Sequence, residues 1–296
     1  LVKAVLLKLL DAIKHHESLL LEHHKEEELH NFRIAVRKTR SLLGQCKKVL
    51  PANRLSRFRR EFSWLGDFTS APRDLDVYLL DLEKMKKKST IDLSTVEPFI
   101  VYLQEKTRQE HERLYDSLTS ARYRRLKNDW QTFLEMPVAR TTRLEDARKS
   151  VMIFSQDRIR ACYNRVIRQG NRIRKNSSDA QLHELRKSCK KLRYMMEFFQ
   201  GLYPDKKINR QLRQLKRLQN KLGRFQDLCV QEAILKEYIQ GLDRDIWAPA
   251  STRLIMDSLQ AKQLQQKKTM HRKIPEVIKR YASAEHLEQS RELFNH

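Results

Sequence analysis

Apolar residues recur every three or four positions along almost the whole chain, and charged residues fill most positions between them. This spacing matches the turn of an α-helix, about 3.6 residues, that buries one face. The pattern predicts helices at about 1–25, 28–50, 52–66, 74–88, 94–119 and 121–136, and a second set at about 143–170, 180–202, 205–222, 225–241, 250–271 and 275–293. We therefore expect an all-α fold.

Residues that break helices are scarce, since only 6 Gly and 7 Pro occur among 296 residues. A β-sheet would need many more turn residues between its strands. The prolines fall near the predicted helix breaks, as expected for residues that cannot continue a helix: Pro51, Pro72, Pro98, Pro137, Pro204, Pro249 and Pro275. The polar run 170–179 is the clearest predicted loop.

The second set of helices repeats the first at an offset of 153 residues. His30-x-x-Arg33-x-x-x-Arg37-x-x-Arg40 returns as His183-x-x-Arg186-x-x-x-Lys190-x-x-Arg193. The same offset relates Leu50-Pro51 to Tyr203-Pro204 and Arg73-Asp74 to Gln226-Asp227. A match that continues without gaps predicts two homologous helical bundles, at 1–140 and 141–296, related as a pseudo-twofold pair.

We call His30, Arg33, Arg37 and Arg40 the first quartet, and His183, Arg186, Lys190 and Arg193 the second quartet. At about 100° per residue, the first quartet falls within an arc of about 80°, opposite an apolar face. Cations three or four residues apart repel one another. No acid lies on the first stripe between His30 and Lys48, although Glu197 lies on the second. A stripe of about 15 Å without acids predicts an anion that spans it; pairing with acids from other helices is the alternative.

More cations with a spacing of three follow each quartet. Lys48 returns to the line of the first quartet. The next helices add Arg54, Arg57 and Arg60 in the first half, and Arg210, Arg213 and Lys216 in the second. They either line the same groove as the quartets or belong to the outer surface, and the spacing alone does not decide between these positions.

The charge of the whole chain supports a polyanionic partner. With 61 Lys+Arg against 37 Asp+Glu, the formal net charge is +24, which points to nucleic acid, an anionic membrane surface or a phosphate polymer. The first helix carries Lys3, Lys8 and Asp11, which suits an amphipathic helix better than a membrane span or signal peptide. Four cysteines without a C-x-x-C pair predict free thiols in a reducing compartment, the cytoplasm. Because the sequence begins with Leu1 and not Met, it leaves open whether it is part of a longer protein.

The paired motifs resemble those of the conserved histidine α-helical domain, or CHAD, family. LHNFRIAVRKTRSLLGQCKKVLP and LHELRKSCKKLRYMMEFFQGLYP are similar to its repeated signature, and RDLDVYLLDL and LGRFQDLCV to its second motif. The resemblance implies two bundles, mainly of four helices each, around a basic central groove or pore. It also implies binding of inorganic polyphosphate by both quartets and association with polyphosphate granules. Lys190 departs from the pattern, because a point charge replaces the guanidinium fork of Arg37.

Three other functions find less support in the sequence. Binding of single-stranded nucleic acid requires aromatic side chains beside the cations, and only Tyr194 lies near a stripe. The histidines at 15, 16, 23 and 24 lack the compact spacing of a metal site, so we expect neither a metal nor another cofactor. Asp74 and Asp227 are interpreted as structural residues that cap helices or anchor arginines. No catalytic motif accompanies the cations, so the sequence predicts binding without catalysis.

Overall fold

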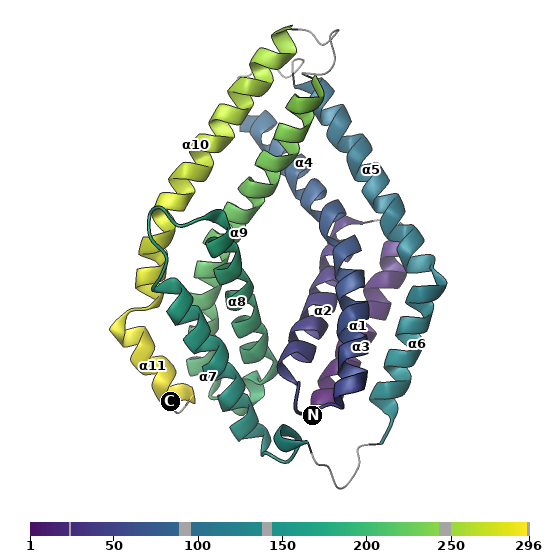
Figure 1. The fold of residues 1–296 in the computed structure, drawn as a ribbon, viewed down its shortest axis with the longest axis vertical. Helices are drawn as coiled ribbons and strands as arrows, with labels where there is room; N and C mark the ends of the chain where they lie inside the picture. Colours follow the sequence, from purple (N-terminus) through teal and green to yellow (C-terminus); the bar gives the residue numbers. More distant parts are fainter. Residues whose placement is uncertain (24, 89–95, 138–143, 243–249, 295–296) are drawn as a thin grey trace. The chain divides into compact units, whose positions relative to one another are not determined.

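The computed structural model describes residues 1–23, 25–88, 96–137, 144–242 and 250–294, and within these ranges the chain is helical and contains no strand (Figure 1). The helices are α1 (Val2–His23), α2 (Glu26–Gln45), α3 (Ala52–Phe68), α4 (Ser70–Lys88), α5 (Glu97–Thr119), α6 (Ala121–Glu135), α7 (Val151–Gly170), α8 (Asp179–Phe198), α9 (Asp205–Leu242), α10 (Ala250–Tyr281) and α11 (Ala284–Phe294). The all-α prediction is therefore confirmed.

The contacts between these helices define two compact units. Unit 1 contains Leu1–Arg73, Thr107–Ile159 and Glu197–Leu202, and unit 2 contains Asp74–Lys106, Arg160–Met196 and Tyr203–His296. These units are defined by contacts, whereas the predicted halves 1–140 and 141–296 are defined by homology, so the predicted division stays a prediction.

Unit 1 is built on four helices, α1, α2, α3 and α6, in which α1 and α3 each pack against both α2 and α6. Aromatic rings fill its interior: the ring centroid of Trp130 lies 4.5 Å from that of Phe58 and 5.4 Å from that of Phe62. Glu17 is also buried in this unit and accepts hydrogen bonds from Tyr123 Oη at 2.8 Å and Lys127 Nζ at 2.5 Å. A buried carboxylate is tolerated here because a hydroxyl and an ammonium group both satisfy it.

In unit 2, α9 packs against α10 and α11. An apolar cluster joins α4, the first turns of α5, the second half of α9 and the start of α10. Its buried members are Leu75, Tyr78, Leu82, Val96, Phe99, Leu103, Leu235 and Met256. Gln263 donates a hydrogen bond of 2.6 Å to the hydroxyl of Tyr78, which satisfies that polar group within the core.

The starts of the helices follow the internal repeat. In the first half α2 begins at Glu26, and its equivalent α8 begins at Asp179. In the same way α3 begins at Ala52 and α9 at Asp205, and α5 begins at Glu97 and α10 at Ala250. Each second member therefore begins 153 residues after the first, the offset of the sequence repeat. The two quartets thus occupy equivalent positions on equivalent helices, while the pseudo-twofold axis itself stays a prediction.

The prediction of separate helices at 205–222 and 225–241 is wrong, because α9 runs without interruption from Asp205 to Leu242. In the first half, Pro72 lies in the opening turn of α4, just after the break that ends α3. Its counterpart 153 residues later is Phe225, which is buried and fits a helix interior. Gly223 alone costs about 1 kcal/mol relative to alanine, which the buried side chains around it offset.

The predicted break before Pro275 is also wrong, since α10 continues through this residue to Tyr281. A proline inside a helix removes one backbone hydrogen bond and costs about 3 kcal/mol. Ile274, Ile278 and Tyr281 are all buried on either side of it, and their packing holds the helix together. The prediction of one helix at 275–293 is wrong too, because α10 ends at Tyr281 and a separate helix, α11, begins at Ala284. Elsewhere the helix boundaries differ from the prediction by eight residues at most, with the largest differences at α2, which ends at Gln45, and α7, which begins at Val151. The predicted loop at 170–179 is confirmed between α7 and α8.

Candidate anion-binding site

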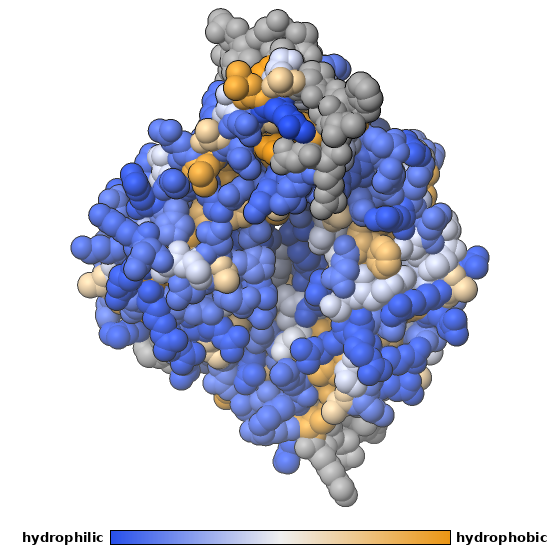
Figure 2. All heavy atoms as spheres, turned by 45° about the horizontal axis from the view of Figure 1, so that its top comes forward, coloured by the Kyte–Doolittle hydropathy of each residue, from blue (hydrophilic) through white to orange (hydrophobic). Residues whose placement is uncertain are grey.

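The first quartet projects from one face of α2, opposite the residues that this helix buries in unit 1. The buried side of α2 includes Leu29, Phe32, Val36 and Leu43. All four members of the quartet are half-buried, which is uncommon for arginine outside an ion pair or a binding site. Figure 2 shows hydrophilic side chains over most of the visible surface, so half-burial and not charge alone distinguishes the quartet.

Arg33 joins α2 to the end of α3. Its Nη1 donates to the carbonyl oxygens of Thr69 and Ser70, each at 2.8 Å. The last turn of a helix leaves carbonyl groups without partners inside the helix, and the helix dipole makes this end negative. The guanidinium therefore stabilises the end of α3 as well as contributing positive charge to the quartet.

Arg40 lies across α3 at Gly66. Its Nη2 donates to Ser63 Oγ at 3.1 Å. A Cβ atom at position 66 would collide with the guanidinium, whose Cζ would be 3.1 Å away. Glycine is needed here because a side chain approaches the helix closely, and not because of an unusual backbone conformation.

Replacing Gly66 with alanine should therefore displace Arg40. Alanine in a helix interior normally gains about 1 kcal/mol over glycine. Gly223 inside α9 has open space around its Cα and serves as the matched control. We expect Gly223→Ala to raise the melting temperature by a few degrees, and Gly66→Ala to raise it less because the hydrogen bond between Arg40 and Ser63 is lost. Equal shifts in thermal unfolding would contradict the contact between Arg40 and Gly66.

Positive charge is concentrated around His30. Burial, and next the positive charges of Arg73, Arg37 and Arg33, lower the pKa of this histidine below its usual value, while Glu27 acts in the opposite direction. Among the residues that the structure describes, Arg37 forms neither an ion pair nor a hydrogen bond through its side chain, and its Nε is buried. A half-buried guanidinium without a partner favours binding of an anion.

The histidine of the second quartet has a different neighbour. His183 Nδ1 lies 2.5 Å from Oε1 of Gln226 on α9. The amide oxygen can only accept, so this contact is a hydrogen bond when Nδ1 of His183 carries the proton. The counterpart of Gln226 in the repeat is Arg73, so a cation stands beside His30 where a neutral amide stands beside His183.

Arg186 of the second quartet faces a carboxylate. Burial raises the pKa of Asp227, the positive charge of Arg186 opposes this change, and the negative charge of Asp74 adds to it. Asp227 lies in the interior of α9 and Asp74 is the fifth residue of α4, so neither caps a helix. The interpretation of these residues as helix caps is wrong, whereas that of an anchor for an arginine agrees with the position of Asp227.

The rest of the second quartet resembles the first in exposure. Lys190 and Arg193 are half-buried, and Arg193 lies over the ring of Tyr194 with 5.1 Å between its Cζ and the ring centroid. Tyr194 itself is buried, so it offers no exposed face on which a base could stack.

The cations that follow the quartets are arranged differently. Several pair with acids: Lys48 with Glu145 at 2.5 Å, Arg57 with Asp129 of α6, and Arg210 with Glu285 of α11 at 2.8 Å. On α3, Ser63 and Gly66 face α2 while Arg57 faces α6, so the structure does not bring Arg57 to the first quartet. Arg60, Arg213 and Lys216 are exposed, and their part in binding stays a prediction.

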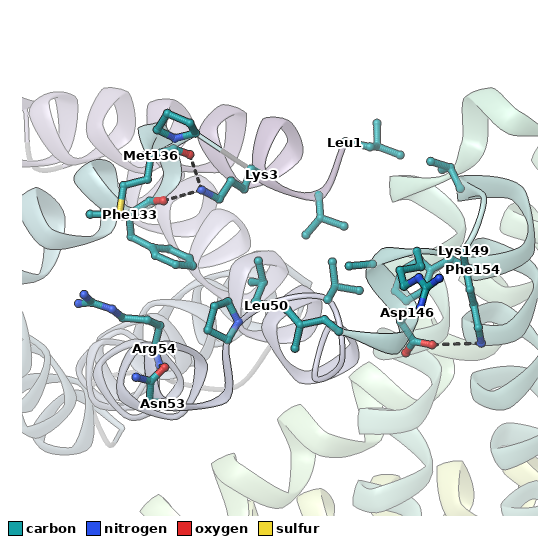
Figure 3. A pocket seen from close by; sticks show the side chains of 18 of the residues that line it. Leu1, Lys3, Leu50, Asn53, Arg54, Phe133, Met136, Asp146, Lys149 and Phe154 are labelled. Atoms are coloured by element: carbon teal, nitrogen blue, oxygen red, sulfur yellow. Dashed lines mark hydrogen bonds and ion pairs between the residues drawn. The ribbon is translucent and has the colours of Figure 1, made fainter. Parts of the chain in front are cut away.

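Arg54 lines a cavity of about 1040 Å³ in unit 1 (Figure 3). The walls are mainly apolar and include Leu50, Phe133 and Phe154. Figure 3 shows Lys3 donating to the carbonyl oxygens of Phe133 at 2.9 Å and Met136 at 2.6 Å, so this cation is used within the fold. None of the quartet residues lines the cavity.

Glu197, the acid predicted to lie on the second stripe, belongs to unit 1 in the structure. There it forms an ion pair of 2.9 Å with Lys38 of α2. Glu197 therefore neutralises a neighbour of the first quartet. The prediction that both quartets line one continuous groove concerns the two units together and stays a prediction.

The N-terminal histidines make ordinary polar contacts. His16 Nδ1 lies 2.7 Å from Glu28 Oε2, and His24 is outside the described residues. Within the described ranges, no group of three or more His, Cys, Asp and Glu side chains is arranged to hold a metal ion. In the same part of the chain, no helix has the length and apolar character needed to cross a membrane.

Sequence reasoning missed the residues that support the quartets. Ser63, Gly66, Arg73 and Gln226 each lie beside a quartet member, and only the last two carried a signal, as equivalent positions of the repeat. Helical spacing places residues on a face of their own helix but does not identify the helix opposite.

Comparison with known proteins agrees with the repeated motifs. A family model described as CHAD domain matches residues 4–236, which include both quartets. Among solved structures, the chain is similar to the CHAD domain from the plant Ricinus communis, with a TM-score of 0.71 and 27% identity over 91% of this chain and 89% of that chain. It is also similar in fold to PptA from Streptomyces chartreusis, with a TM-score of 0.70 and 14% identity over 93% and 97% of the two chains. No curated protein sequence matches. The family match extends over most of the chain, which therefore belongs to the CHAD domain family.

Proposed function

We propose that this protein binds inorganic polyphosphate through the two quartets and catalyses no reaction on it. The observation that carries the proposal is the group of half-buried cations around His30, in which Arg37 has no partner among the described residues. An anion bound there would neutralise Arg37 and relieve the repulsion between His30, Arg33 and Arg73.

A polymer of phosphates fits two quartets better than a single anion does. Each quartet presents its charges along about 15 Å of helix, which one phosphate could not span. Arginine binds phosphate oxygens through two parallel N–H groups, and lysine binds them as a point charge. The repeat provides this arrangement twice, so a flexible chain of phosphates supplies matching charges at both.

Nucleic acid is the competing ligand, and its bases would need aromatic surfaces. Tyr194, the aromatic residue nearest a quartet in sequence, is buried, and so are Phe32 and Phe199. Contact would then be limited to the phosphate backbone, without the contribution of about 1–3 kcal/mol from each stacked base. This favours polyphosphate over single-stranded RNA at the quartets.

Binding without turnover follows from the chemistry of the side chains. Arginine and lysine hold phosphate but do not activate water at neutral pH, and hydrolysis requires a general base or a metal-bound hydroxide. Asp227 lies beside Arg186, where it serves to hold that arginine. A protein with this specificity would collect on polyphosphate granules in the cytoplasm.

A competition assay tests the proposal. Long-chain polyphosphate and single-stranded RNA, at equal phosphate concentration and fixed salt, would each displace a labelled polyphosphate from the protein. We expect polyphosphate to compete at concentrations at least about tenfold lower. Equal competition by both polymers would contradict selective binding of polyphosphate, and release of orthophosphate during the assay would contradict the absence of catalysis.

The lowered pKa of His30 predicts that binding depends on pH. A phosphate beside His30 favours its cation, so binding takes up a proton and affinity should rise as the pH falls through the region near 6.5. We therefore expect higher affinity at pH 5.5 than at pH 7.5, measured by titration of labelled polyphosphate at fixed salt. His30→Gln should remove most of this gain.

The stability of the protein without ligand should decrease as the pH falls, whereas its affinity for polyphosphate should increase. The pKa of His30 in the folded protein lies below the unfolded value of about 6.5, so its contribution to stability is complete above that pH and is lost as the pH falls through the folded pKa. Thermal unfolding of the unliganded protein should therefore show less acid destabilisation for His30→Gln than for the wild type. An identical pH dependence of the two proteins would contradict the positive environment of His30.

A further inference from the structure

The exposed face of α10 carries a second row of cations, outside the residues that match the family model. Its members are Lys262, Lys268, Arg272, Lys273, Lys279 and Arg280, which we call the α10 stripe. All six are exposed, and in the described part of the chain none of them forms an ion pair. They fall within an arc of about 140° and extend over about 27 Å of helix. Glu276 is the one acid among them within α10.

The internal repeat provides a comparison for this stripe. The equivalent helix in the first half is α5, which has three basic and five acidic residues, against five and one in the equivalent part of α10, residues 250–272. Lys262, Lys268, Arg272 and Lys273 correspond to Gln109, Tyr115, Thr119 and Ser120, none of which is charged. The charges of α5 also pair within the helix, for example Arg113 with Glu110. The fold therefore does not require the α10 stripe, and its uncompensated charge calls for a ligand.

The α10 stripe lies beside the start of α8, within unit 2. Lys267 forms an ion pair of 2.6 Å with Asp179, the first residue of α8, and His183 of the second quartet follows one turn later. The segment between α7 and α8 lies beside α10 (Figure 1). His271 Nε2 of α10 is 2.7 Å from the carbonyl oxygen of Ser177 in this segment. Lys175 of this segment faces the stripe across a hollow of about 460 Å³. The other residues lining the hollow are Thr269, Arg272, Lys273 and Glu276.

The α10 stripe offers charge and hydrogen-bond donors but no aromatic platform. The one Phe, Tyr or Trp of α10 is Tyr281, which is buried. Bases of a nucleic acid would gain nothing by stacking here, so the stripe recognises phosphate groups alone.

We propose that the α10 stripe, together with Lys175, binds the part of a long polyphosphate chain that extends beyond the second quartet. This inference rests on the proposed function. A short oligophosphate bound at a quartet would not reach the stripe, whereas a long chain would occupy both surfaces. Affinity should then increase with chain length after the quartets are filled, because the second contact forms within the same complex.

The test compares two quadruple variants of equal charge. The first, K262Q/K268Q/R272Q/K273Q, neutralises four members of the stripe. The control, K8Q/R124Q/K206Q/K236Q, neutralises four exposed cations on α1, α6 and α9, none of which forms an ion pair in the described part of the chain. Affinity for long-chain polyphosphate and for tripolyphosphate is measured at one salt concentration, with circular dichroism to confirm the helical fold.

We expect the stripe variant to bind long-chain polyphosphate roughly tenfold more weakly than the control variant, with each exposed contact contributing about a factor of two. Tripolyphosphate should bind both variants alike. Equal long-chain affinity of the two variants would overturn the inference, and so would an equally large loss of tripolyphosphate affinity in the stripe variant. Failure of the wild-type protein to bind any polyphosphate would instead refute the proposed function, so the two failures are distinguishable.

Discussion

Charge reversal at Arg37 and Lys190 together should abolish polyphosphate binding and leave the helical fold intact. The two residues are equivalent in the repeat, lie in the middle of their quartets and are half-buried. Each reversal removes a charged hydrogen bond to phosphate, worth about 1.5–3 kcal/mol, and places a carboxylate on the path of the chain. We therefore expect the R37E/K190E variant to lose at least about a hundredfold in affinity.

The control must change the total charge equally at positions that touch neither quartet. Lys8 on α1 and Lys236 on α9 are exposed, without ion pairs within the described residues, and belong to units 1 and 2 respectively. The K8E/K236E variant should lose only a few-fold in affinity, by weakening the long-range field. Equal losses in the two variants would show that the ligand responds to net charge and that the quartets are not its site.

The stability of the R37E/K190E variant shows whether it loses binding without losing its structure. Arg37 has no partner among the described residues, so its reversal should leave the free energy of unfolding within about 0.5 kcal/mol of the wild type. Arg40 differs, because its hydrogen bond to Ser63 and its packing over Gly66 belong to unit 1 itself. Reversal at Arg40 should therefore reduce both affinity and thermal stability, and Arg37 gives the cleaner test of the site.

How far the sequence predicts the structure depends on the range of the interaction. The quartets, their half-buried face and the equivalence of α2 and α8 follow from helical spacing and from the offset of 153 residues. The continuity of α9 did not follow from the sequence, because it depends on tertiary packing that buries Phe225, close to the weak local break signal of Gly223. The break predicted before Pro275 is wrong for the same reason, since the buried neighbours that keep α10 helical cannot be identified from the local sequence.

Contacts between helices account for most of what was missed at the site. The sequence places Arg33 and Arg40 on the same stripe as Arg37, yet both are hydrogen-bonded to α3 or to the residues just after it. These hydrogen bonds serve the packing of the bundle, and the proposed function assigns the same two arginines to the binding surface. The acids that pair with Arg57 and Arg210 lie 72 and 75 residues further along the chain, a separation at which spacing gives no information.

The two histidines show that the repeat does not make the two sites identical. Arg73 and Gln226 occupy equivalent positions, but one places a cation beside His30 and the other an amide oxygen beside His183. In the proposed function, a phosphate at the first quartet favours the cation of His30, whose pKa is lowered by burial and by the neighbouring arginines.

Added salt should reduce the affinity for polyphosphate by a larger factor than any single substitution does. The quartets hold six permanent cations, five arginines and one lysine, which displace counterions from the bound chain. By analogy with single-stranded nucleic acid, log Kd should rise with a slope of about 0.7 per contact, or roughly 4 for six contacts. A fourfold increase in salt would then reduce affinity several-hundred-fold, measurable by titration of labelled polyphosphate from about 50 to 200 mM salt.

Neutralising Arg37 and Lys190 to Gln should lower the slope by about 1.4, while neutralising Lys8 and Lys236 should leave it unchanged. A slope near zero in the wild-type protein would mean that the ligand is held by contacts other than ion pairs, and the quartets would then have no role in its binding.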